Sequence, residues 1–174
     1  MSLLKKFLGL GDEKVSVAGG DTATVRRIAS ELERLPPTTA KYLAAFAYVL
    51  ARVAHADLEI DDAETREMQR ITTSLAELSE AEATLVVEIA KNQARLLGET
   101  ENYVVTREFR NIATAAQRGQ LLQCLFAVAA ADGTISSAES AEIAAIGEEL
   151  GFTRPEINAF RSQYRDKLSE FQSA

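Results

Sequence analysis

Leu121-Leu-Gln-Cys-Leu-Phe-Ala-Val-Ala-Ala-Ala-Asp-Gly-Thr-Ile-Ser-Ser-Ala-Glu139 is an apolar run followed by a short acidic segment. A related stretch, Phe46-Ala-Tyr-Val-Leu-Ala-Arg-Val-Ala-His-Ala-Asp-Leu-Glu-Ile-Asp-Asp-Ala-Glu64, lies in the first half of the chain. When positions 50–75 are aligned with positions 125–150, 11 of the 26 are identical without a gap. Chance rarely gives such agreement in a chain of ordinary composition. The sequence therefore predicts an internal repeat, over about 40–90 and 115–165, whose unit is a buried helix, a tight loop and a second helix.

The rest of the chain is also typical of helices. From Asp21 onward, apolar residues recur at spacings of three and four, with almost no sustained alternation, and this favours α-helix over strand. The segments 39–56 and 117–131 are apolar on nearly every side, so we expect them to form the buried centre. The predicted helices span about 22–35, 39–56, 62–77, 80–97, 103–113, 117–131, 137–150 and 154–171. The predicted fold is all-α, a compact bundle of seven to eight helices built from two helical hairpins related by a pseudo-twofold axis.

Composition excludes several classes of protein. The chain has 174 residues, of which 47% are hydrophobic and 26% charged, as in ordinary soluble globular proteins. Its single cysteine excludes an intrachain disulfide, and its single histidine excludes sites built from several imidazoles. The net charge of −7 argues against non-specific nucleic-acid binding. No run approaches the roughly 20 apolar residues of a membrane-spanning helix.

The segment 1–20 differs from the remainder of the chain. Leu3, Leu4, Phe7 and Leu8 can share one face of a short helix that contacts a membrane or a partner, but the glycines that follow favour a loosely attached segment. We expect residues 1–20 to be flexible or weakly amphipathic and residues 21–174 to form a single domain. The segment lacks the continuous apolar core of a secretory signal, so the expected location is the cytoplasm, as a monomer or homodimer.

The glutamates at the two acidic segments fit a structural role. Asp61-x-x-Glu64 and Ser136-x-x-Glu139 match the capping box, in which the third helical residue reaches back to the amide that begins the helix. The same pattern occurs outside the repeat, at Ser79-x-x-Glu82 and Thr153-x-x-Glu156. A calcium EF-hand is rejected, because the positions of its first two ligands hold apolar Val128 and Ala130 in the second copy and Val53 and His55 in the first.

The aspartates are harder to explain by capping alone. Asp57 and Asp132 follow the C-terminal ends of the two buried helices, where a carboxylate faces the negative end of the helix dipole. Each therefore needs a partner, which can be a cation, a Lys or Arg side chain, or the amides of the next helix. If the two loops converge, Asp57, Glu64, Asp132 and Glu139 would form a cluster of oxygen ligands. Such a cluster suits Ca²⁺, Mg²⁺ or Mn²⁺ better than Zn²⁺.

The two signatures also carry a family resemblance. Ala131-Asp-Gly-Thr-Ile-Ser-Ser-Ala-Glu139 after its apolar helix, and Ala56-Asp-Leu-Glu-Ile-Asp-Asp-Ala-Glu64 in the first copy, resemble the signatures of the TerB-like proteins, named for tellurite resistance. The resemblance covers about residues 40–165. It implies an all-helical fold, a divalent-cation site at the acidic signatures and a role in a bacterial stress response, with no chemical reaction. Leu58 departs from the pattern, since the family has glycine there, and this puts the equivalence of the two sites in doubt.

Three functions therefore stay open. The first is a cation-dependent TerB-like interaction module, and the second is a metal-independent helical scaffold whose acidic motifs are caps and salt bridges. The third, a metal-dependent hydrolase, has little support, because the chain lacks a glycine-rich phosphate loop and the Glu-x-x-His pairs of di-iron bundles. His55 is interpreted as a packing or surface residue, and Cys124 as a small buried packing residue. The stretch from Arg107 to Arg110, with Phe109, is interpreted as a contact surface or, more simply, a solvated helix face. The protein partners stay unknown.

Overall fold

The computed structural model describes residues 22–54, 61–92, 102–131 and 133–172. Within these ranges the chain forms eight α-helices and two short 3₁₀ helices, η2 (Arg165–Lys167) and η3 (Ser169–Phe171). The α-helices are α2 (Thr22–Glu33), α3 (Pro37–Ala54), α4 (Asp62–Leu75), α5 (Glu80–Lys91), α7 (Asn102–Ile112), α8 (Ala115–Ala130), α9 (Ser137–Glu149) and α10 (Arg154–Ser162). The all-α fold predicted from the apolar periodicity is confirmed. The predictions for residues 1–20 and for His55 lie outside the described residues.

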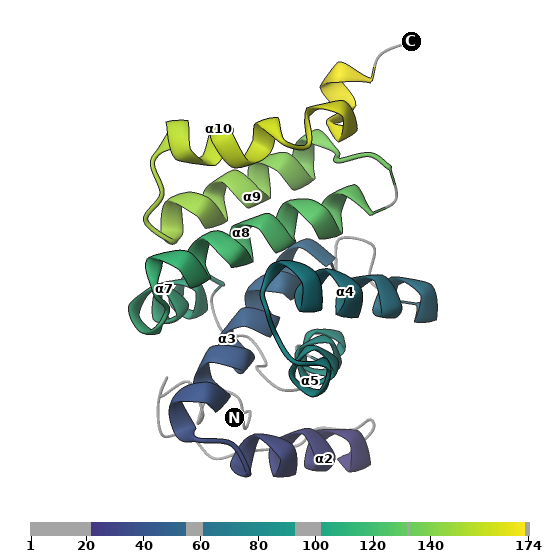
Figure 1. The fold of residues 1–174 in the computed structure, drawn as a ribbon, viewed down its shortest axis with the longest axis vertical. Coiled ribbons are helices and arrows are strands. Elements are labelled where there is room, and N and C mark those ends of the chain that lie inside the picture. Colours follow the sequence, from purple (N-terminus) through teal and green to yellow (C-terminus); the bar gives the residue numbers. More distant parts are fainter. Residues whose placement is uncertain (1–21, 55–60, 93–101, 132, 173–174) are drawn as a thin grey trace.

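The helices are stacked along the long axis of the molecule (Figure 1). α10, α9 and α8 lie side by side at one end, α2 lies at the other, and α3, α4 and α5 occupy the space between them. α3 contacts α2, α5, α7, α8 and α9, and α8 contacts α3, α4, α9 and α10. These two helices therefore connect the two halves of the stack.

Burial confirms that α3 and α8 form the centre. The side chains of α3 from Leu43 to Leu50 are at most 4% exposed. On α8, Leu121, Leu122, Cys124, Leu125 and Phe126 are fully buried. A helix with apolar residues on nearly every side can be buried only between several neighbours, which is the position that both helices occupy.

Several helix boundaries differ from those predicted, and three of them have a clear physical reason. α3 begins at Pro37 rather than near Thr39, because proline needs no hydrogen-bonded amide in the first turn of a helix. α5 ends at Lys91 rather than near Gly98, because the Asn92 side chain donates a hydrogen bond of 2.9 Å to the carbonyl of Glu88. α10 ends at Ser162, so the single helix predicted to reach Phe171 is wrong. The segment after it pairs with the loop before α9, as described below.

The helix starts follow the capping pattern. All four predicted capping boxes are present, at Asp61/Glu64, Ser79/Glu82, Ser136/Glu139 and Thr153/Glu156. A fifth, Thr114/Gln117, begins α8 slightly before the predicted start. Thr-x-x-Gln satisfies the same rule, since a glutamine oxygen also accepts from the capping amide.

The internal repeat is visible in the helix boundaries. α4 and α9 begin at Asp62 and Ser137, two positions that the repeat alignment pairs with each other. α3 packs against α5 and α9, and the corresponding α8 packs against α10 and α4. The order of the helices thus repeats, whereas the pseudo-twofold relation between the hairpins stays a prediction.

An aromatic cluster joins α7 to this framework. The ring of Phe109 lies 5.4 Å from that of Tyr42 and 6.0 Å from that of Phe46, both on α3. Phe109 is fully buried, so it belongs to the core and not to a solvated or contact surface. The exposed side of α7 carries Arg107 and Arg110 instead.

Candidate functional site

The acidic signatures lie at two helix–loop–helix junctions. The first joins α3 to α4 and the second joins α8 to α9. Asp57 and Asp132, two of the four predicted cation ligands, lie outside the described residues. Glu64 and Glu139, the other two, lie in the first turns of α4 and α9. The structure therefore places half of the predicted ligand set, and the set of four stays a prediction.

Glu64 and Glu139 both close capping boxes. The amide of Asp61 donates to Glu64 Oε2 over 3.0 Å, and the amide of Ser136 donates to Glu139 Oε1 over 3.0 Å. In the other direction, the amides of Glu64 and Glu139 donate to the side chains of Asp61 and Ser136. The capping interpretation is thus confirmed at both signatures. Among the described residues, none donates a hydrogen bond to the second carboxylate oxygen of either glutamate.

The C-terminal segment holds the second loop in place. Ile135 is buried and pairs with Leu168 as an isolated parallel bridge, in which the Ile135 amide donates to Lys167 O and the Ser169 amide to Ile135 O. The side-chain amide of Gln172 also donates to Gly133 O over 2.9 Å. This pairing gives a reason why α10 stops early, since residues 167–169 donate to and accept from a loop instead of continuing a helix.

Gly133 shows why the second signature contains a glycine. Its φ angle is +98°, in a region that residues with a side chain rarely adopt, although the space around its Cα is open. Backbone conformation, and not crowding, therefore requires glycine here. Leu58 occupies the equivalent position in the first copy, and it lies outside the described residues.

No cluster of potential metal ligands is present in the described part of the chain. Within residues 22–54, 61–92, 102–131 and 133–172, no three side chains of His, Cys, Asp or Glu come together in a way that could hold a metal ion. A site with three such ligands at the signatures would thus have to include residues outside these ranges, such as Asp57 and Asp132.

Arg52 is the central residue of a charge network that the sequence analysis missed. Its side chain, in the last turn of α3, is only 9% exposed. The guanidinium donates to Glu142 Oε1 through Nε (2.9 Å) and Nη2 (2.6 Å), to Glu149 through Nη1 (3.2 Å), and to Thr106 Oγ1 (2.9 Å). Arg52 thereby ties the end of α3, just before the first acidic loop, to α9 and α7.

The network has no counterpart at the positions that the repeat alignment pairs with its members. Residues equivalent to Arg52 and Glu149 are Ala127 and Ser74, while the equivalent of Glu142, Glu67, pairs with Arg70 on its own helix. The repeat alignment therefore gives no indication of a role for Arg52. Its one sequence signal is a basic residue in the last turn of a helix that is otherwise hydrophobic from Tyr42 to Ala54.

Comparison with known families agrees with the two signatures. The model of the family described as "Tellurite resistance protein TerB" matches residues 42–162, which is well over half of the chain. The chain belongs to the TerB family. No match was found among curated proteins or among solved structures. The matched region of this TerB domain begins within α3, so α2 precedes it.

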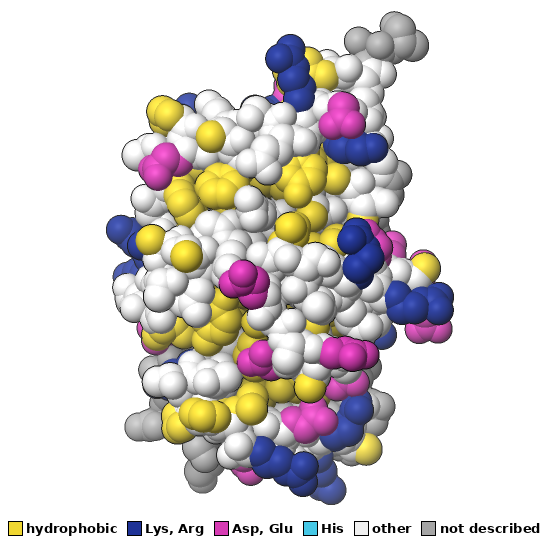
Figure 2. Space-filling view, viewed as in Figure 1, with side chains coloured by type: hydrophobic (Ala, Val, Ile, Leu, Met, Phe, Trp, Pro, Cys, Tyr) yellow, Lys and Arg dark blue, Asp and Glu magenta, His cyan; other side chains and the backbone are white. Residues whose placement is uncertain are grey.

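Among the described residues of this TerB-family chain, no helix is both long and apolar enough to cross a membrane. Figure 2 instead shows apolar surface bordered by carboxylate side chains towards the end of the molecule where α2 and α5 lie.

Cys124 is confirmed as a buried residue of the core. Burial raises the pKa of its thiol from 9.0 to about 12. The folded protein therefore retains a proton that the unfolded chain releases above pH 9, so stability must fall as the pH rises through this range. By urea unfolding between pH 9 and pH 10, we expect the parent protein to lose about 1 kcal/mol more stability than Cys124→Val. Tyr42, Tyr48 and Tyr164, whose pKa values burial also raises, contribute a loss in both proteins. An equal loss in the variant would contradict this assignment.

Proposed function

We propose that this chain is a non-enzymatic TerB-family interaction module whose two acidic loops bind a divalent cation. The observation that supports the proposal is the matched position of Glu64 and Glu139, each at the start of the helix that follows an acidic loop. In both, one carboxylate oxygen is held by the capping amide. A carboxylate oriented in this way can offer its other oxygen to a cation without a further loss of side-chain freedom.

In this proposal Asp57 and Asp132 supply the remaining charge, and the bound ion is Ca²⁺, Mg²⁺ or Mn²⁺, which prefer oxygen ligands. Binding would fix the angle between the helical hairpins and so present a surface to a partner protein. Membership of the TerB family supports a role in a bacterial stress response of the tellurite-resistance type. In this proposal the module catalyses no reaction.

A specific observation favours the alternative, a metal-independent scaffold. Glu82 and Glu156 close capping boxes of the same geometry outside the signatures. Capping by itself thus accounts for a glutamate at the third position of a helix. The two functions differ in whether the signature carboxylates respond to a cation.

Thermal unfolding of the metal-stripped protein, titrated with Ca²⁺, Mg²⁺, Mn²⁺ and Zn²⁺, tests the cation site. A ligand at 100 times its dissociation constant should add about 2.7 kcal/mol to the free energy of unfolding. We expect one of the oxygen-seeking ions to raise the melting temperature in a saturable way, and the rise to disappear in Asp57→Asn and Asp132→Asn.

Glutamine variants separate binding from capping, because glutamine also completes a capping box. Glu64→Gln and Glu139→Gln should leave the melting temperature of the metal-free protein nearly unchanged but weaken the cation response. Glu82→Gln and Glu156→Gln, which make the same change outside the signatures, should also leave the melting temperature nearly unchanged, and they should not weaken the cation response. No rise with any ion in the parent protein would refute the cation site and leave the scaffold.

A further inference from the structure

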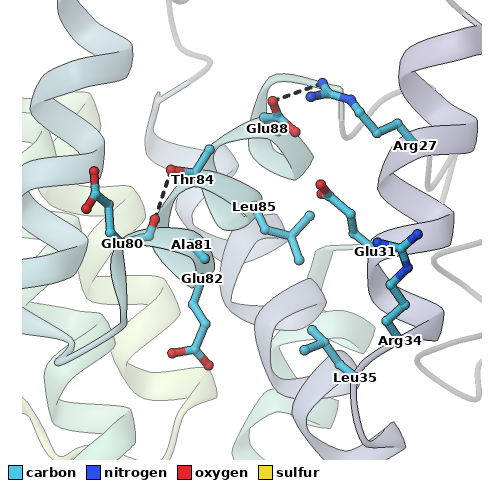
Figure 3. A pocket seen from close by; sticks show the side chains of 10 residues that line it. All are labelled: Arg27, Glu31, Arg34, Leu35, Glu80, Ala81, Glu82, Thr84, Leu85 and Glu88. Atoms are coloured by element: carbon cyan, nitrogen blue, oxygen red, sulfur yellow. Dashed lines mark hydrogen bonds and ion pairs between the residues drawn. The ribbon is translucent and has the colours of Figure 1, made fainter.

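A groove between α2 and α5 has an apolar floor and a carboxylate rim. Its volume is about 670 Å³. Figure 3 shows Leu85 of α5 pointing into the space between the helices, with Leu35 at the end of the α2 side. Arg27 of α2 and Glu88 of α5 form an ion pair of 2.9 Å at one end. The groove is therefore closed at that end by the ion pair, and Leu35, Ala81 and Leu85 supply its apolar lining.

The rim of the groove carries an excess of negative charge. Four glutamates and two arginines line it: Glu31, Glu80, Glu82, Glu88, Arg27 and Arg34. After the Arg27–Glu88 pair, three glutamates and one arginine remain among the lining residues. Glu31 points into the space between the helices (Figure 3), and among the described residues it forms no ion pair. An occupant that combines an apolar face with basic side chains would be complementary to both the floor and the rim.

The chain itself contains such a segment. In Met1-Ser-Leu-Leu-Lys-Lys-Phe-Leu-Gly-Leu-Gly11, helical spacing puts Leu3, Leu4, Phe7 and Leu8 on one face and leaves Lys5 and Lys6 beside it. These residues precede α2, which forms one wall of the groove. They lie outside the described residues, and what is known of them is their sequence pattern.

The connection between residues 3–8 and α2 is long enough to reach any part of the groove. Residues 9–21 can span roughly 40 Å when extended, whereas Thr22 and Arg34, at opposite ends of the α2 wall, are roughly 18 Å apart along the helix. A short tether also holds the segment at a high local concentration, so that a weak contact suffices for docking.

We propose that residues 3–8 dock as a basic amphipathic helix in the groove between α2 and α5 of the same chain. Leu3, Leu4, Phe7 and Leu8 cover the floor around Leu85, and the basic side chains of Lys5 and Lys6 meet the carboxylate rim at Glu31. α2 precedes the region matched by the TerB family, so the groove lies partly outside the matched region. It is independent of the proposed cation site.

Paramagnetic broadening in the full-length protein tests the proposal. A nitroxide label on Gly9→Cys reports where the segment lies, because the native Cys124 is buried and its thiol pKa is raised to about 12, which keeps it unreactive towards the label. We expect the amide signals of Arg34, Thr84 and Leu85 to disappear, while those of α9 and α10 remain.

Matched variants identify the contacts. Leu4→Asp combined with Phe7→Asp should restore the lost signals, and so should Glu31→Lys. Glu108→Lys, a charge reversal on α7 away from the groove, should not. Persistent broadening in both groove variants, uniform broadening over the molecule, or none at all would overturn the proposal.

A mixed sample shows whether the segment occupies the groove of its own chain or that of a second copy. Isotope-labelled protein without the nitroxide is combined with spin-labelled protein that carries no isotope. Docking within one chain predicts no loss of signal in this mixture. Loss of the α2 and α5 signals there would assign the segment to the groove of another copy and overturn docking in the same chain.

Discussion

Phe109→Ala should lower the free energy of unfolding by about 3–5 kcal/mol, the cost typical of removing a large aromatic ring from a close-packed core. The ring is fully buried and contacts the rings of Tyr42 and Phe46. Its loss leaves a cavity between α7 and α3 that the surrounding helices can only partly fill. Urea unfolding followed by circular dichroism measures the change.

Tyr103→Ala provides the matched control on the same helix. Tyr103 is 52% exposed and its ring lies under the guanidinium of Arg107, so its removal should cost less than about 1 kcal/mol. A small effect of Phe109→Ala, similar to that of Tyr103→Ala, would show that α7 is not an integral part of the core.

Phe109 also shows what the sequence could and could not predict. Periodicity correctly placed a helix near 103–113, but a short helix with arginines on either side of a phenylalanine gives little information about which face is buried. The burial of the two long apolar helices was predictable, because nearly every face of α3 and α8 must be covered by other helices. Helix order and helix starts were therefore predictable, since both depend on local patterns.

Contacts between distant segments were not predictable in this way. The pairing of Ile135 with Leu168 ended α10 early, and no periodicity in residues 154–171 indicates that the loop before α9 competes for their backbone groups. Arg52 was missed for the same reason, since its partners lie on α7 and α9, far along the chain from α3. At the acidic signatures, the sequence predicted the capping role of Glu64 and Glu139 correctly. The cation role depends on whether two loops meet, which a local pattern cannot determine.

Arg52→Met should lower the free energy of unfolding by about 2–3 kcal/mol, somewhat less than the roughly 3–5 kcal/mol that removing one member of a fully buried ion pair costs. The cost arises because the remaining charge is left without a partner. Here the side chains of Glu142 and Glu149 are 40% and 23% exposed, so water compensates part of the loss. Methionine retains most of the apolar volume of the arginine stem, and the measured change then reports mainly the lost hydrogen bonds and charge. Chemical denaturation at constant ionic strength measures it.

Arg27→Met is the matched control, because it breaks a single ion pair, to Glu88, at a side chain that is 55% exposed. Its cost should be below about 1 kcal/mol. Arg52→Lys should fall between the two, since one ammonium group cannot reproduce the fork that reaches Glu142, Glu149 and Thr106 together. If Arg52→Met were no more destabilising than Arg27→Met, the network would be a surface contact. α3 would then be held against α9 by the remaining contacts between the two helices alone.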